Sequence, residues 1–384
     1  MQIFKNPNFD FMKFKFFAFG LSAIIILVGL LNMTIGKGII YGIDFAGGTL
    51  IRVIFKNPVP IDTIRSLLNS QGLGKSRIQE VGATQQEYII RTLQLTGEDI
   101  QDELEAHEII GNKVVDTLRP SEDKTNLEAG LLDLNSIDVQ DLTELLPPEL
   151  ENRENIAQQI IDYRRVKGII KSFEDLSTSL NLPPEALTAL KEKTFLGNLA
   201  ILSRETVGPQ VGHDLRRKAT QATIWALIGM LIYIGLRFKF AYGISAILTL
   251  AHDVLVTVGI FSLTNRELNL PVIAAILTIV GYSLNDTIVI FDRIRDNLRI
   301  LRKDPLVKII NTSINQTLSR TIITSGTTLL TVIALFLFGG EVINDFAFTM
   351  IIGVLAGTYS SIYQSCAYLY FWNNIFKPKK GLRK

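Results

Sequence analysis

The sequence predicts an α-helical membrane protein with six transmembrane helices and a ferredoxin-like α+β domain that carries a helical insertion. Three observations support this class. The chain of 384 residues is 47% hydrophobic with a mean hydropathy of +0.28, and both values are high for a soluble protein. Its apolar runs lie at 14–35 and 220–373, whereas residues 36–218 have the composition of a soluble domain. Within that domain, strand-like and helix-like segments follow the order βαββαβ.

Windows of about 20 apolar residues mark the six predicted spans. We place them at 14–35, 220–236, 240–263, 270–291, 321–338 and 346–372. The first span resembles a signal peptide in its position. Its apolar core, FFAFGLSAIIILVGLLNM, is longer than a signal peptide requires and has no small-x-small cleavage site. We therefore interpret it as a membrane anchor.

Lysine and arginine indicate the orientation of the spans. They gather in residues 1–13, at 237–239, in the predicted loop or helix 292–320 and in the tail 373–384. With six spans, all four segments fall on the same side of the membrane. By the positive-inside rule that side is the cytoplasm. Both termini are therefore predicted to be cytoplasmic, and residues 36–218 to form an extracytoplasmic domain.

The extracytoplasmic domain begins with YGIDFAGGTLIRVIF, in which residues 50–55 alternate as a strand. The Gly47-Gly48 pair before them permits a bend or bulge. The remaining expected elements are a helix after Pro60, strands at 76–82 and 86–92, a helix at 97–111 and a last strand at 198–208. This order favours a ferredoxin-like sandwich, interrupted by an extra segment at about 128–195.

The extra segment resembles a helix-hairpin-helix module. We expect Asn135 and Asn155 to cap two short helices, and LPPEALTALKE to begin another with proline in its first turn. Such modules commonly bind DNA, but the hairpin LPPEL lacks the glycines that let backbone N–H groups approach phosphate. Glutamates beside it also oppose nucleic-acid binding. We therefore expect a packing or partner-docking role and no nucleic acid.

Ionisable and polar residues inside the apolar spans predict the functional site. They are His252 and Asp253 in the third span, Asn285 and Asp286 in the fourth, and Arg320 at the start of the fifth. Intramembrane ionisable residues usually face a bundle interior and mark ion or proton paths. The alternative is that they only join helices through hydrogen bonds. We favour function for the Asp286 and Arg320 positions and leave both interpretations open for the third span.

Arg320 belongs to a polar stripe on its own helix. Residues Ser313, Thr317, Arg320, Thr324, Thr327 and Thr331 recur at spacings of three and four, which places them on one helical face. An arginine cannot release its proton in a protein, whereas a carboxylate can. We therefore interpret Arg320 as a fixed positive charge and Asp286 as a partner that either titrates beside it or locks it in place. The alternative for Thr324 and Thr327 is a hydrogen bond to a carbonyl of their own helix.

The sequence contains no catalytic motif in a plausible context. It has no phosphate-binding glycine loop, no His-Glu-x-x-His and no Ser-His-Asp arrangement, so we expect neither enzyme activity nor a cofactor or metal. The one cysteine, Cys366, lies in an apolar run, which rules out a disulfide framework. Gly353 and Gly357 are typical of a helix-packing face.

Taken in order, the motifs resemble the SecF branch of the SecD/SecF family of protein-export membrane proteins. The matching segments are YGIDFAGGT, ETVGPQVGHDLRRKA, HDV, VGYSLNDTIVIFDRIRDN and NQTLSRTIITSGTTLL. They occur in this order along the chain, and the resemblance extends over nearly all of it except the extra segment at about 128–195. The resemblance implies one six-span half of an RND-type transporter in the bacterial inner membrane. It also implies that Asp286 and Arg320 belong to proton-dependent machinery.

The resemblance implies partners as well. Family members work with SecD, which supplies the other six spans, and use the proton-motive force to promote late steps of preprotein export. The implied complex includes the SecYEG translocon, SecA and YajC. Two alternatives keep the fold but change the role: an RND-like half-transporter for lipid or solute export, and a non-transporting assembly subunit.

Overall fold

The computed structural model describes residues 4, 7–82, 84–92 and 103–376. The chain divides into two compact units. One, called here the sheet unit, is Ile43–Leu215. The other, called the membrane unit, contains the residues up to Gly42 and those from Arg216 onward.

The membrane unit contains six helices that are long and apolar enough to cross a bilayer. The short helix η1 (Phe11–Phe14) continues into α1 (Lys15–Thr34), and the others are α10 (Pro209–Arg237), α11 (Phe240–Leu263), α12 (Leu270–Ile300), α13 (Leu306–Phe338) and α14 (Gly340–Phe376). The predicted class of a six-helix membrane protein is therefore confirmed. Helix α12 continues beyond residue 291, where its predicted span ends, and α13 begins 15 residues before Thr321, where the next predicted span begins. The segment 292–320 is therefore helical except around 301–305.

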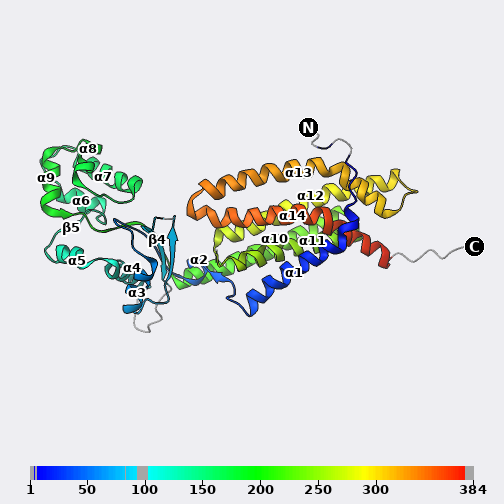
Figure 1. The fold of residues 1–384 in the computed structure, drawn as a ribbon, viewed down its shortest axis with the longest axis horizontal. Helices are drawn as coiled ribbons and strands as arrows, with labels where there is room; N and C mark the ends of the chain where they lie inside the picture. The colour runs from blue at the N-terminus through cyan, green and yellow to red at the C-terminus, as the bar shows by residue number, and fades with distance from the viewer. Residues whose placement is uncertain (1–3, 5–6, 83, 93–102, 377–384) are drawn as a thin grey trace, which may run out of the picture. The chain divides into compact units, whose positions relative to one another are not determined.

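Helix α14 packs against α11, α12 and α13 (Figure 1). Two glycines on α14 permit this close approach. A Cβ atom added at Gly353 would lie 2.1 Å from Ile279 Cδ1, and one added at Gly357 would lie 3.0 Å from Ser283 Cβ. The predicted packing role of this glycine pair is confirmed, with α12 as the neighbour.

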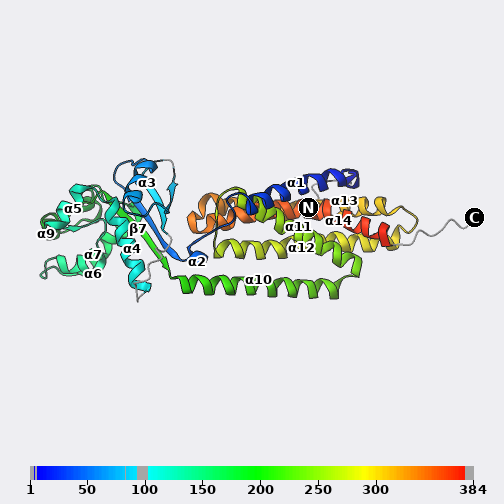
Figure 2. The ribbon, with the colours of Figure 1, turned by 90° about the horizontal axis from the view of Figure 1, so that it is seen from below.

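Helix α1 crosses α11 at a second glycine contact. A Cβ atom on Gly29 would lie only 2.5 Å from the Cα atom of Gly259, so the two backbones touch. After α1, strand β1 (Ile40–Tyr41) pairs in parallel with β8 (Glu267–Leu268). Helix α10 lies along one edge of the bundle (Figure 2), and its exposed side chains include Trp225 and Leu236.

The sheet unit contains the predicted ferredoxin-like sandwich. Its elements are α2 (Ile43–Ala46), β2 (Gly48–Phe55), α3 (Ile61–Ser70), β3 (Arg77–Val81), β4 (Glu87–Thr92), α4 (Glu103–Leu118) and β7 (Leu199–Val207). The sheet order is β3-β4-β2-β7 and every pair is antiparallel. This is the strand order of a split βαβ fold. The predicted helix 97–111 lies partly outside the described residues, and its described part continues to Leu118.

One face of the sheet is covered by α3 and α4. Alternate residues of β2 and β4, such as Val53 and Tyr88, are fully buried against Ile64 of α3 and Val114 of α4. This is the period-two pattern expected for a sheet with one buried face. Gly47 and Gly48 have φ values of +71° and +135°, so the predicted bend is present. The bulge itself lies further on, between Arg52 and Val53.

The extra segment forms a helical subdomain with its own core. It follows α5 (Ser121–Glu128) and comprises β5 (Leu132–Asp133), α6 (Val139–Leu145), α7 (Arg153–Lys167), α8 (Phe173–Leu180), α9 (Pro184–Lys193) and β6 (Thr194–Phe195). Strands β5 and β6 pair in parallel where the chain enters and leaves it. The core includes Leu142, Ile160 and Leu190. Pro184 occupies the first turn of α9, as predicted.

The two asparagines predicted as caps have other positions. Asp138 caps α6, because its side chain accepts a hydrogen bond from the Asp141 amide. Asn135 is instead fully buried and binds the backbone of Ile170 and of Gly197. Asn155 lies inside α7, which begins at Arg153. Both predictions were wrong. For Asn135, an asparagine before an apolar run has the same sequence pattern in a cap and in a buried polar contact. For Asn155, the helix begins two residues earlier, with Asn152 as its N-cap.

Candidate functional site

Asp286 lies in the middle of α12 and is buried, with 3% of its surface exposed. Its Oδ2 accepts a hydrogen bond of 3.2 Å from Ser325 Oγ of α13. Ser325 Oγ in turn accepts a 2.8 Å hydrogen bond from Thr358 Oγ1 of α14. The carboxylate therefore binds a hydroxyl of α13 directly and is linked to α14 through it. Its burial fits a group that faces the bundle interior.

Arg320 and Asn285 have the opposite environment. Both side chains are exposed on the membrane unit. Within the described part of the chain, no ion pair within 4.0 Å joins Arg320 to Asp286. Asn285 lines a groove of about 440 Å³ between α10 and α12, together with Gly229, Met230, Tyr233, Gly281, Leu284 and Ile288. The structure thus places the predicted carboxylate and arginine on neighbouring helices without direct contact.

The threonines of the polar stripe bind their own helix. Thr324 Oγ1 donates to the carbonyl of Arg320 at 3.0 Å, and Thr327 Oγ1 donates to the carbonyl of Ile323 at 2.9 Å. Thr331 repeats the pattern with Thr327. This is the alternative geometry considered for Thr324 and Thr327, in which each hydroxyl is satisfied by a carbonyl of its own helix.

A second polar cluster surrounds Asp253 of α11, whose surface is 0% exposed. Its Oδ1 lies 2.9 Å from His252 Nδ1, and its Oδ2 accepts hydrogen bonds from Ser283 of α12 and, at 2.8 Å, from Ser360 of α14. His252 Nε2 lies 2.7 Å from Ser22 Oγ of α1. One carboxylate and one imidazole therefore connect four helices.

Sequence reasoning missed the hydroxyl and amide partners of this cluster. Ser22 also accepts a 2.9 Å hydrogen bond from Gln364 Nε2 and lies 3.4 Å from the Tyr359 hydroxyl. Further along α14, Ser361 contacts Thr287 at 3.1 Å. One sequence pattern does point to these partners. Ser361 and Ser365 are four residues apart within the apolar sixth span, which indicates a polar face on that helix.

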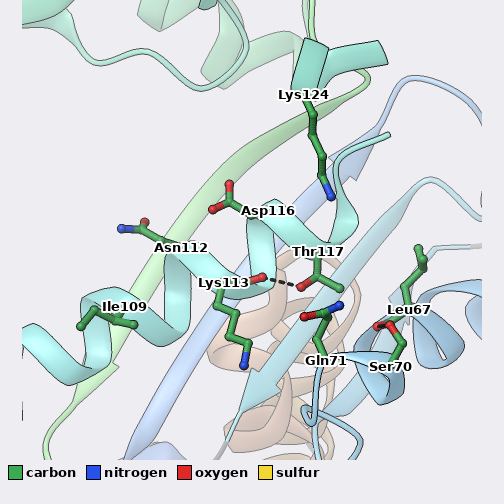
Figure 3. A pocket seen from close by; sticks show the side chains of 9 residues that line it. All are labelled: Leu67, Ser70, Gln71, Ile109, Asn112, Lys113, Asp116, Thr117 and Lys124. Carbon is green, nitrogen blue, oxygen red and sulfur yellow. Dashed lines mark hydrogen bonds between the residues drawn. The ribbon is translucent and has the colours of Figure 1, made fainter. Parts of the chain in front are cut away.

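The sheet unit offers a different kind of candidate, a surface pocket of about 570 Å³ between α3 and α4 (Figure 3). Leu67 and Ile109 are exposed apolar side chains at its wall, and Lys113, Asp116 and Lys124 supply charge. The Thr117 hydroxyl donates a hydrogen bond of 2.6 Å to the Lys113 carbonyl of its own helix (Figure 3). Across the described residues, no group of three or more His, Cys, Asp or Glu side chains is arranged to hold a metal ion.

Comparison with known proteins establishes the family. The family described as "Protein export membrane protein SecD/SecF, C-terminal" matches residues 187–375, and the "SecD/SecF GG Motif" matches residues 34–59. The protein translocase subunit SecF of Koribacter versatilis is 39% identical over 379 residues, which cover 94% of this chain and 91% of the relative. The chain belongs to the SecD/SecF family.

Other SecD/SecF members extend the comparison. The SecF subunit of Escherichia coli O157:H7 is 32% identical, with 94% of this chain and 86% of the relative covered. The crystal structure of SecDF from Thermus thermophilus matches with a TM-score of 0.63 and 32% identity, over 96% of this chain. This chain spans only 39% of that SecDF chain. The family resemblance seen in the sequence is confirmed, and with it a multi-pass protein of the bacterial membrane.

Proposed function

We propose that this chain is the SecF-type half of a proton-driven protein-export complex in the bacterial inner membrane. It works with a SecD-type half and uses the proton-motive force to promote late steps of preprotein export. SecYEG, SecA and YajC complete the proposed complex. The chain itself acts as a mechanical coupling subunit and not as an enzyme. Relatives named as translocase subunits favour protein as cargo over the lipid or solute alternative.

The exposure of Asn285 carries this proposal. Asn285 lies inside the apolar window 270–291 of α12, the part of the helix predicted to cross the bilayer. A primary amide facing lipid there would leave its donors and acceptor without partners, at a cost of several kcal/mol. A second membrane half that covers α12 would supply those partners. The long SecDF chain of Thermus thermophilus supports SecD as that half.

Asp286 and Arg320 supply the proposed proton coupling. Asp286 is a buried carboxylate that is able to take up and release a proton, and Arg320 is a permanent cation on the next helix. Each elementary charge that crosses 100 mV carries about 2.3 kcal/mol. Protonation of Asp286 would remove its attraction for Arg320, which favours movement of α13 relative to α12. We assign Asn285 to the same coupling surface.

The orientation follows from charge. Basic residues at the N-terminus, at 237–239, in 292–320 and in the tail favour the cytoplasmic side for both termini. The sheet unit then lies outside, where an exported chain emerges. For the helical subdomain we propose a packing or docking role without nucleic acid.

The test compares two carboxylates on α12. We expect Asp286→Asn to reduce proton-motive-force-stimulated export at least tenfold, with normal protein levels and normal copurification of the partner half. Arg320→Ala should behave in the same way. Asp292→Asn is the matched control, because Asp292 forms a partly exposed pair with Arg237 at 2.7 Å and such pairs contribute little. Stimulated export that persists in Asp286→Asn contradicts the proposal, whereas loss of copurification favours the assembly-subunit alternative.

A further inference from the structure

We propose that His252 and Asp253 form a second proton-binding site, separate from Asp286, and that Ser22 couples this site to α1. This inference rests on the proposed use of protons by the complex. It concerns groups that the coupling by Asp286 and Arg320 does not use. Its basis is the buried geometry of the cluster rather than the sequence positions alone.

The hydrogen-bond directions around Asp253 are fixed by chemistry. An ionised carboxylate only accepts, so the hydrogen on His252 Nδ1 points to Oδ1 at 2.9 Å, and Ser360 donates to Oδ2 at 2.8 Å. Ser283 donates to the same oxygen. Within the described residues, no lysine or arginine lies within 4.0 Å of Asp253. The imidazole of His252 is therefore its only titratable partner at ion-pair distance.

The far nitrogen of the imidazole is where a proton enters. With a neutral ring, the Nε2 lone pair accepts from the Ser22 hydroxyl at 2.7 Å, and the cluster carries one negative charge on Asp253. A proton from water adds to Nε2 and makes the ring a cation. The cluster then holds one positive and one negative charge and is neutral overall. Asp253 then has a compensating positive charge beside it, with 2.9 Å between His252 Nδ1 and Asp253 Oδ1.

Uptake of this proton reorients Ser22. Once Nε2 carries hydrogen it donates to Ser22 Oγ, so the Ser22 hydroxyl hydrogen must turn elsewhere. The Tyr359 hydroxyl oxygen, 3.4 Å away, is free to accept it, because the Tyr359 hydrogen is donated to the Ala18 carbonyl of α1 at 2.8 Å. Gln364 continues to donate to Ser22 at 2.9 Å. The charged form thus adds one hydrogen bond between α1 and α14.

One further observation concerns the acceptors near Ser22. Among the residues that the structure describes, the Oε1 atom of the fully buried Gln364 has no hydrogen-bond partner, so the cluster has spare acceptor capacity beside Ser22. Ser22, His252 and Tyr359 also line a cavity of about 240 Å³ whose other lining side chains are apolar. The other titratable groups that face the cluster are the phenols of Tyr359 and Tyr368, on α14, and Asp286, which lies one turn from Ser283 on α12. Phenols stay neutral near pH 7.

The test uses the small number of histidines. The chain has three, so ¹⁵N-histidine labelling of the full chain in lipid nanodiscs gives one signal pair for His252 and two internal controls. We expect the His252 ring to pass from the neutral form with hydrogen on Nδ1 to the doubly protonated form as the pH falls. Asp253→Asn should lower the proton affinity of the ring at least tenfold, because the compensating charge is lost. A ring that keeps one protonation state from pH 5 to 9, or that titrates unchanged in Asp253→Asn, overturns the inference.

Ser22→Ala provides a second variant in case Asp253→Asn does not fold. We expect the proton affinity of His252 to fall severalfold, because the protonated ring loses the acceptor for its Nε2 hydrogen. Ser245→Ala is the matched control, since Ser245 is buried on α11 and, among the described residues, its hydroxyl binds only the Ala241 carbonyl. Unchanged titration in Ser22→Ala removes the proposed link to α1. These measurements do not depend on export, so the two failures can be told apart. Export that is not stimulated by the proton-motive force contradicts the proposed function. A His252 ring that does not change its protonation state contradicts this inference.

Discussion

Asn135 shows how much one buried side chain contributes to the helical subdomain. Its amide donates to the carbonyls of Ile170 and Gly197 at 3.1 and 2.9 Å and accepts from the Ile170 amide at 2.8 Å. These contacts join the start of the subdomain to its middle and to its exit. A buried backbone group without a partner costs about 1–3 kcal/mol, so the three contacts together are worth several kcal/mol.

Asn135→Ala is therefore expected to destabilise the subdomain by about 3 kcal/mol or more. Hydrogen exchange of the core amides of α7, such as Ile160, in the full chain measures this change. Asn155→Ala is the control, because Asn155 is exposed in the first turn of α7 and its loss should stay within about 0.5 kcal/mol. Equal effects of the two substitutions would show that Asn135 does not hold the subdomain together.

At the scale of elements, α13 binds the N-terminal segment through one face. Asn311, Asn315 and Ser319 are four residues apart and accept hydrogen bonds from the backbone amides of Met12, Phe9 and Phe4. Asn315 also donates to the Phe9 carbonyl at 2.8 Å. The helix thus satisfies the backbone of an irregular segment, which would otherwise need water.

Asn315→Ala should loosen this segment, because the backbone amide and carbonyl of Phe9 both lose their hydrogen-bond partner on α13. Two hydrogen bonds are worth about 2 kcal/mol, so we expect roughly thirtyfold faster hydrogen exchange at the Phe9 amide. Thr331→Val serves as the control on the same helix, since the Thr331 hydroxyl donates to the Thr327 carbonyl of its own helix. Exchange at Phe9 that stays at the wild-type rate would refute the assignment.

At the scale of the whole molecule, the membrane unit has the features of a half that needs a partner. Its polar residues divide into two groups: Asp253 and Asp286 are buried and hydrogen-bonded within the unit, whereas Asn285 and Arg320 are exposed on its surface. If the exposed group meets a second half, its replacement should weaken association and leave folding intact.

Asn285→Leu tests this division. We expect it to weaken pairing with the SecD-type half by about 0.6–2 kcal/mol, which is roughly three- to thirtyfold in affinity, as for other interhelical hydrogen bonds in membranes. Fluorescence energy transfer between the labelled halves in nanodiscs measures the affinity. Thr278→Val is the control, because Thr278 is exposed on α12 and its hydroxyl binds the Ala274 carbonyl. Unaltered or tighter pairing in Asn285→Leu would mean that this amide does not face the partner.

The sequence was sufficient for the architecture because its signals are periodic and local. Apolar windows indicated the six helices, and alternation along residues 50–55 indicated the strand at the centre of the sheet. The sequence did not predict hydrogen-bond partners that are far apart along the chain and meet only in the folded protein. Ser22 and His252 are 230 residues apart, and a single serine in an apolar helix has no distinguishing pattern. The same limit explains Asn135, whose contact with Gly197 spans 62 residues.

The contact of Gly29 with Gly259 lies between two polar contacts that hold α1 against α11. Ser22 lies seven residues before Gly29, about 10 Å along the axis and on the same face, and contacts His252. Three residues after Gly29, the Asn32 amide donates to the carbonyl and the hydroxyl of Ser262 at 2.9 and 3.2 Å. A side chain larger than hydrogen at residue 29 would separate the two backbones between these polar contacts, so the glycine pair allows both contacts to form.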